Sequence, residues 1–164
     1  MFISPEVLQQ HWEYSVWATN RLLEAAGQLS AEELTRDFKT ADGSVLETLT
    51  HLFWSETIWL SRFKKFDTPA RPARGTQHLE DLQRHWPALH SEWRSYLAEA
   101  NYPMATLTYR DLKGQEWTQP IWILLLHVVN HSTHHRGQVS GFLRSMGHVP
   151  PPLDFVAYHR QLSA

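Results

Sequence analysis

The sequence predicts an all-α protein, a four-helix bundle in which one long crossover connection joins two of the helices. Four long segments place apolar residues at the spacing of one helix face, and they cover residues 5–26, 44–63, 77–100 and 121–147. A loop rich in Pro, Gly and Arg follows the second segment at residues 66–76, and we interpret it as the crossover. At 164 residues the chain has the length of one domain, so we expect a single domain over residues 1–164.

Helix-start signals support the first two long segments. At residues 4–6, Ser-Pro-Glu combines a capping serine, a proline at the first helical position and an early acid, and Gly27 can close the helix that follows. Residues 30–33, Ser-Ala-Glu-Glu, have the form of a capping box and predict a short helical turn. Residues 44–47, Ser-Val-Leu-Glu, form a second capping box at the head of the second long helix.

The third long segment, residues 77–100, contains Pro87, which predicts a kink there or a later helix start. Its histidines, His78, His85 and His90, have no partner four residues away. We interpret them as surface or boundary residues.

A small β-hairpin is expected before the last long helix. Residues 107–109 and 115–118 are rich in strand-forming side chains, and they flank a turn at 113–114, Lys-Gly. Pro120 then starts the last helix and Gly147 ends it.

Histidines are concentrated in that last helix. His127, His131 and His135 follow one another at intervals of four residues, so their rings form a stripe along one face. A metal–imidazole bond is about 2.0–2.1 Å long, whereas His127 and His135 are roughly 12 Å apart along the helix axis. One ion can therefore be held by either neighbouring pair, but not by all three, and a further ligand must come from another element.

The apolar face of the same segment indicates where such a site lies. His131 and His135 flank that face, so a site there would be half buried and open on one side, which suits a metal ion with an exchangeable position. Bundles commonly build metal sites between facing helices. The simplest further ligand is His51, a histidine inside a strongly amphipathic segment with start signals at its head.

Glu56 falls in the middle of the apolar stripe of residues 44–63, an unusual place for a carboxylate. One interpretation is a core carboxylate at the end of the core or paired with an Arg or a Trp N–H. The other is a carboxylate that orients a ligand histidine. The pattern alone does not choose between them.

Composition excludes several classes of function. The net charge is −2 and basic residues are scattered, so there is no footprint for nucleic acid or for an anionic membrane. No Cys is present, which excludes disulfides, zinc–thiolate sites and a nucleophilic thiol of the protein itself. The N-terminal residues lack the basic start and apolar run of a signal peptide, and apolar runs stay far below the ~20 residues that span a bilayer. We expect a cytoplasmic protein.

Three blocks of sequence carry a family resemblance. They are DGS at 42–44 with LTHLFWSE at 49–56 and WL at 59–60, then LHVVNHSTHHRGQ at 126–138, then LRSMG at 143–147 followed by Pro151, Pro152 and Asp154. With these blocks the chain resembles the DinB family of bacterial metal-binding four-helix bundles, also described as DinB/YfiT-like. The resemblance covers nearly the whole chain in order.

The resemblance implies that His51, His131 and His135 are the metal ligands, which chooses between the two pairs left open above. It implies one divalent transition metal ion, Zn or Ni first, with Fe, Mn and Cu as further candidates. Candidates for contacts behind the ligands or with a substrate are Glu56, His127, Asn130 and Gln138. Arg136 matches the motif and points toward the core, whereas Gln138 lies on the histidine side.

Relatives in the wider superfamily include transferases and isomerases that use a low-molecular-weight thiol such as bacillithiol or mycothiol. The resemblance therefore implies a metal-dependent S-transferase in which the thiol attacks a small-molecule electrophile. A metal-water hydrolase with Glu56 as general base and a non-catalytic metal-binding stress-response protein are the alternatives. The resemblance also implies a homodimer.

Overall fold

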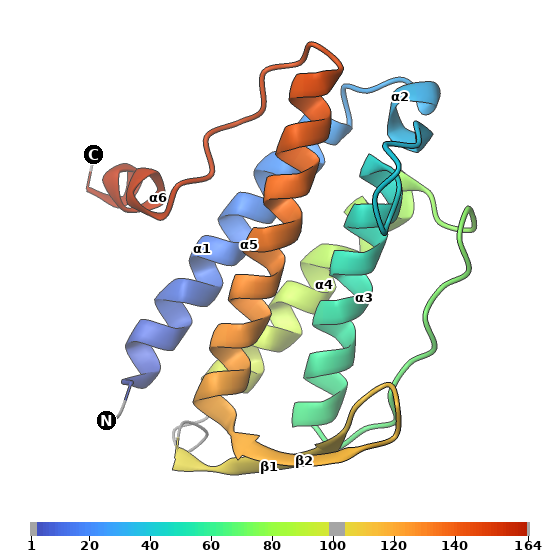
Figure 1. The fold of residues 1–164 in the computed structure, drawn as a ribbon. Helices are drawn as coiled ribbons and strands as arrows, with labels where there is room; N and C mark the ends of the chain where they lie inside the picture. The colour runs from blue at the N-terminus through green and yellow to red at the C-terminus, as the bar shows by residue number, and fades with distance from the viewer. Residues whose placement is uncertain (1–2, 99–103, 164) are drawn as a thin grey trace.

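The computed structural model describes residues 3–98 and 104–163. Four long helices, α1 (Pro5–Ala26), α3 (Val45–Phe63), α4 (Leu79–Leu97) and α5 (Ile121–Ser145), form the bundle. The shorter elements are α2 (Ala31–Thr35), α6 (Phe155–Leu162) and the strands β1 (Thr106–Arg110) and β2 (Glu116–Pro120). The predicted helical bundle is confirmed, and α5 lies beside both α1 and α3 (Figure 1).

The crossover returns along the length of the bundle, because α3 and α4 run in the same direction (Figure 1). The indole N–H of Trp54 donates to the carbonyl of Pro69 at 3.2 Å, which ties the loop to α3. The backbone N–H of Gly75 donates to the carboxylate of Glu47 at 2.7 Å. The loop therefore lies against α3, the helix that carries His51.

The helix caps largely follow the sequence. Ser4 caps α1, and the capping box of Ser30 and Glu33 is complete at the head of α2. At the head of α3 only half of the predicted box forms: Ser44 accepts from the N–H of Glu47, but the Glu47 carboxylate binds the crossover loop instead. A contact distant in sequence has taken the place of the local one.

Helix α4 begins at Leu79, two residues later than the predicted start, and continues through Pro87. The predicted end at residue 100 falls outside the described residues. Exposed positions for His78 and His85 are confirmed. The prediction for His90 is wrong: it is only 2% exposed, because its ring packs in the core against Trp12 and Trp86.

The predicted hairpin is present. Strands β1 and β2 pair antiparallel with Leu107 opposite Gln119 and Tyr109 opposite Trp117. Leu107 is buried, and the Tyr109 ring packs edge-on against Trp59 of α3 at 5.1 Å. The hairpin thus covers the end of the bundle at which α5 begins (Figure 1). Among the described residues, no helix combines the length and apolar character that crossing a bilayer requires.

Candidate metal centre

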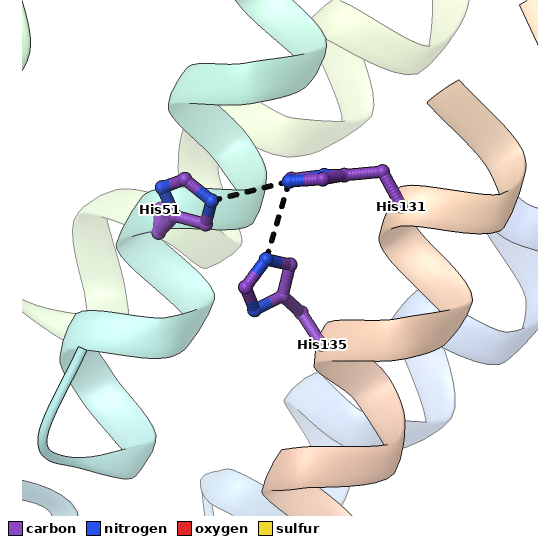
Figure 2. Close-up of side chains that lie close together, drawn as sticks. All are labelled: His51, His131 and His135. Atoms are coloured by element: carbon purple, nitrogen blue, oxygen red, sulfur yellow. Dashed lines mark hydrogen bonds between the residues drawn. The ribbon is translucent and has the colours of Figure 1, made fainter. Parts of the chain in front are cut away.

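Three histidine side chains from two helices converge on one point. Figure 2 shows the rings of His131 and His135 extending from α5 toward His51 on α3. The Nε2 atom of His131 lies 3.3 Å from Nε2 of His51 and 3.2 Å from Nε2 of His135. Among the described residues, this is the cluster of His, Asp or Glu whose ligand atoms approach closely enough to share one ion.

Two of the three nitrogen–nitrogen separations match those around a tetrahedral metal ion, and all three ligand atoms lie within 4.8 Å of one another. Two nitrogens bound to such an ion at about 2.0–2.1 Å lie about 3.3–3.4 Å apart. The two measured N–N distances, 3.3 and 3.2 Å, need almost no adjustment to reach that value. The residues present could therefore hold one metal ion through three imidazole nitrogens.

His127, the first member of the stripe, is not part of this cluster. Its ring centre is 5.8 Å from that of His131, and it packs edge-on against Trp59 at 5.3 Å. Of the two histidine pairs that the spacing left open, the structure brings the pair His131 and His135 to His51.

A hydrogen bond fixes which ring nitrogen of His135 carries the proton. Its Nδ1 lies 2.7 Å from Oε1 of Gln138, an atom that can only accept, so Nδ1 carries the proton and donates. The Nε2 lone pair is then free on the side of the other two histidines, which is the usual arrangement behind a metal-bound imidazole. The Gln138 amide N–H₂ donates in turn to Nε2 of His134 at 3.3 Å.

The other two rings have weaker support. Nδ1 of His131 lies 3.4 Å from the Ser55 hydroxyl, and Nδ1 of His51 is buried with no hydrogen-bond partner among the described residues. Gln138 is therefore the clearest orienting residue, and it is one of the candidates that the sequence proposed.

Burial keeps the three imidazoles neutral at pH 7. It lowers the pKa of His131 to about 3, with the neighbouring imidazoles of His135 and His51 adding to the effect. Burial also lowers the pKa of His51 and of His135, although Asp42 opposes the shift in both and Gln138 opposes it in His135. Neutral imidazole is the form that binds a metal, so protons compete weakly for these nitrogens.

An ion pair beside the cluster was not anticipated from the sequence. Oδ2 of Asp42 lies 3.6 Å from Nδ1 of His135, and Oδ1 accepts from the Arg71 guanidinium at 3.0 Å. In the sequence, Asp42 belongs to the first motif block and Arg71 to the loop rich in Pro, Gly and Arg. Nothing in the local pattern of either segment indicates that they meet.

Glu56 is 1% exposed, and its carboxylate accepts from the Trp86 indole at 2.7 Å and from the Ser132 hydroxyl at 3.1 Å. His90 lies beside this pair, with Nε2 at 3.7 Å from the carboxylate. The structure thus bears out the pairing with a Trp N–H. Glu56 binds the residue next to His131 and makes no hydrogen bond to a ring of the cluster.

The remaining motif residues lie away from the convergence point. The Arg136 side chain is buried, as expected, and its guanidinium donates to the carbonyl and hydroxyl of Ser15 and the hydroxyl of Thr19 on α1. Asn130 is exposed on α5. Arg136 therefore links α5 to α1, the other helix that packs beside α5.

Comparison with known proteins shows the family and agrees with the fold. The family model described as DinB family matches residues 4–162. The chain belongs to the DinB family. It is 23% identical to Protein DinB of Bacillus subtilis (strain 168) over 155 residues, which cover 90% of each protein. Its fold is similar to the crystal structure of a DinB-like protein from Bacillus cereus ATCC 10987, with a TM-score of 0.68 and 18% identity over 93% of this chain and 99% of that one.

Proposed function

We propose that this DinB-family protein is a divalent-metal-dependent S-transferase, which joins a low-molecular-weight thiol such as bacillithiol or mycothiol to a small electrophile. The observation that carries the proposal is the convergence of three neutral Nε2 atoms at separations of 3.2 and 3.3 Å. Three neutral ligands leave a 2+ ion its full charge and a fourth position for a small molecule, which is typical of catalytic sites rather than structural ones.

A divalent ion at these histidines would lower the pKa of a thiol bound beside it, so that the sulfur is nucleophilic at neutral pH. The chain contains no Cys, so the sulfur must come from a small molecule. In the transfer, the thiol proton passes to solvent and a C–S bond forms as the leaving group departs with its electron pair. Neutral imidazoles suit Zn, Ni, Fe and Cu. We propose Zn or Ni first, with Fe, Cu and Mn as further candidates.

The surroundings of Glu56 favour a thiol reaction over hydrolysis. A hydrolase needs a general base that reaches the attacking water, and Glu56 was the candidate. Its two carboxylate oxygens accept hydrogen bonds from Trp86 and Ser132, and its side chain is buried in the core. A water-activating base would have to be another residue.

The first test is metal content, measured by elemental analysis on protein purified without a histidine tag. We expect about one divalent ion per chain in wild type, lost in His51→Ala and in His131→Ala. His127→Ala is the matched control, since its ring lies on the same stripe but outside the cluster, and it should keep the ion. No metal in wild type, even after reloading, would refute the proposal.

The second test is conjugation of monochlorobimane by the metal-loaded protein with bacillithiol or mycothiol. Saturable, thiol-dependent conjugation that is absent in His131→Ala would support the transferase. Hydrolysis that persists without any thiol would support a hydrolase instead. Metal binding without turnover across a broad panel of electrophiles and esters would support a non-catalytic metal-binding stress-response protein.

We further propose that the protein forms a homodimer. Size-exclusion chromatography with light scattering measures the molar mass and tests this.

A further inference from the structure

A partly exposed cation lies at the edge of the histidine cluster. The Arg71 side chain, on the crossover loop, is 45% exposed. One of its terminal nitrogens donates to Oδ1 of Asp42 at 3.0 Å, and the other oxygen of that carboxylate lies 3.6 Å from His135. A single carboxylate group therefore separates this guanidinium from the ring of a metal ligand.

The position of Arg71 is supported by aromatic packing. Its guanidinium lies over the ring of Trp54 at 5.5 Å, and the same indole donates to the carbonyl of Pro69, two residues earlier in the loop. Trp54 is itself buried and its ring is a neighbour of His51 at 6.1 Å. The loop, the indole and the guanidinium thus form one side of the site.

Arg71 has hydrogen-bonding capacity left over. A guanidinium carries five N–H donors, and in the described part of the chain its hydrogen bonding is limited to the one contact with Asp42. Arg71 is also near enough to His51 and His135 to contribute to lowering the pKa of each ring. The guanidinium therefore lies beside the histidine cluster, partly exposed and with N–H groups left for a ligand.

The balance of charge favours an anionic ligand. Asp42 and Arg71 neutralise each other, and three neutral imidazoles leave the charge of a divalent ion uncompensated. The nearby acids are already engaged, because Glu47 binds the N–H of Gly75 and Glu56 is buried under Trp86 and Ser132.

We propose that Arg71 recognises a carboxylate on the small molecule that binds at the histidine cluster, so that the site selects anionic thiols over neutral ones. A guanidinium matches a carboxylate with two parallel hydrogen bonds, which an ammonium group cannot reproduce. The inference rests on the proposed function, since it assigns the class of thiol to that same site.

The test compares two thiols of similar size, 3-mercaptopropionate and 2-mercaptoethanol, on protein loaded with Co(II). Binding of each is followed by the change in the visible and near-ultraviolet spectrum of the cobalt, which needs no turnover. In wild type we expect a Kd about five- to tenfold lower for the anionic thiol, the size of one charge-assisted contact at a partly exposed site. Arg71→Gln should bring the two Kd values together, and Arg71→Lys should keep part of the difference.

Arg74→Gln is the matched control. Arg74 lies on the same loop, and its guanidinium donates to the carbonyl of Ala41, so this variant removes one loop charge without removing the Arg71–Asp42 pair and should keep the wild-type preference. Cobalt content is measured for every variant. If Arg71→Gln loses its cobalt, the inference is tested by the two Kd values in wild type and in Arg71→Lys.

Equal Kd values for the two thiols in wild type would overturn the inference while leaving thiol binding intact. A loss of affinity in Arg71→Gln that is the same for both thiols would also overturn it, because Arg71 would then act only by supporting Asp42. If neither thiol changes the cobalt spectrum, the proposed function fails and this inference fails with it.

Discussion

Replacing Glu56 by methionine should lower the free energy of unfolding by about 2–3 kcal/mol, whereas replacing it by glutamine should lower it by less than about 1 kcal/mol. Methionine fills nearly the same volume, so its cost comes from the polar partners. The buried Trp86 indole loses its acceptor, which costs about 1–3 kcal/mol, and the Ser132 hydroxyl adds about 1 kcal/mol. Release of a buried charge offsets part of this loss.

Glutamine can satisfy the same two partners. Its carbonyl oxygen can accept from Trp86, and its amide can donate to Ser132, since a hydroxyl is both a donor and an acceptor. The two variants therefore separate the hydrogen-bonding role of Glu56 from its charge.

The assay is urea unfolding of the metal-free protein, monitored by far-ultraviolet circular dichroism. Tryptophan fluorescence is unsuitable, because the substitution changes the surroundings of Trp86 directly. The reasoning fails if Glu56→Met is as stable as wild type, or if Glu56→Gln loses as much stability as Glu56→Met. Glu56→Gln should also keep its metal, because Glu56 makes no hydrogen bond to the histidine rings.

Three further predictions follow from the same structure. Gly137→Ala should stabilise the protein by about 0.5–1 kcal/mol, because the residue is helical and an added Cβ meets nothing within 4 Å. Gly147→Ala should instead destabilise it by about 1 kcal/mol, because Gly147 has a φ of +89°. Thermal melts in which Gly147→Ala is the more stable variant would contradict this. The folded pKa of His131, about 3, lies below its ordinary value of 6.5, so the folded protein binds fewer protons in that window. Stability of the metal-free protein should therefore be complete above about pH 6.5 and fall as the pH drops toward 3, with a flatter urea-midpoint profile in His131→Gln. Gln138→Leu should weaken metal affinity about 10-fold or more, because His135 loses the acceptor for its Nδ1 proton; Gln138→Glu should retain affinity in a competition titration with a chelator.

Features set by residues close together in sequence were predictable. Such features are the capping serines, the hairpin turn and the glycine after α5, whose signals act within a few residues. Each helix or strand begins or ends close to the residues that carry its signal. His131 and His135 were predicted as one of two pairs for a similar reason, since spacing along one helix determines which rings share a face. Spacing does not determine how that helix is rotated against its neighbours, so the family resemblance was needed to choose the pair.

Features set by distant contacts were not predictable from local pattern. The Asp42–Arg71 pair joins a turn to the crossover loop, and the Glu47 carboxylate leaves its expected cap for Gly75. His90 looked like a boundary residue because no histidine lies four positions away, but it follows Trp86 by one helical turn and enters the core with it. Its position on the tryptophan stripe of α4 was the signal that could have revealed this.

The rotation of α5 is determined by buried polar contacts on either side of the histidine pair. Ser132, next to His131, binds Glu56 of α3, and Arg136, next to His135, binds α1. A helix turns by about 100° per residue, so a slip of one residue would break both contacts and turn both rings away from α3. Both contacts are buried hydrogen bonds, which require a particular direction between donor and acceptor. The apolar packing around them has no such requirement. We infer that these two contacts hold the rings of His131 and His135 toward His51.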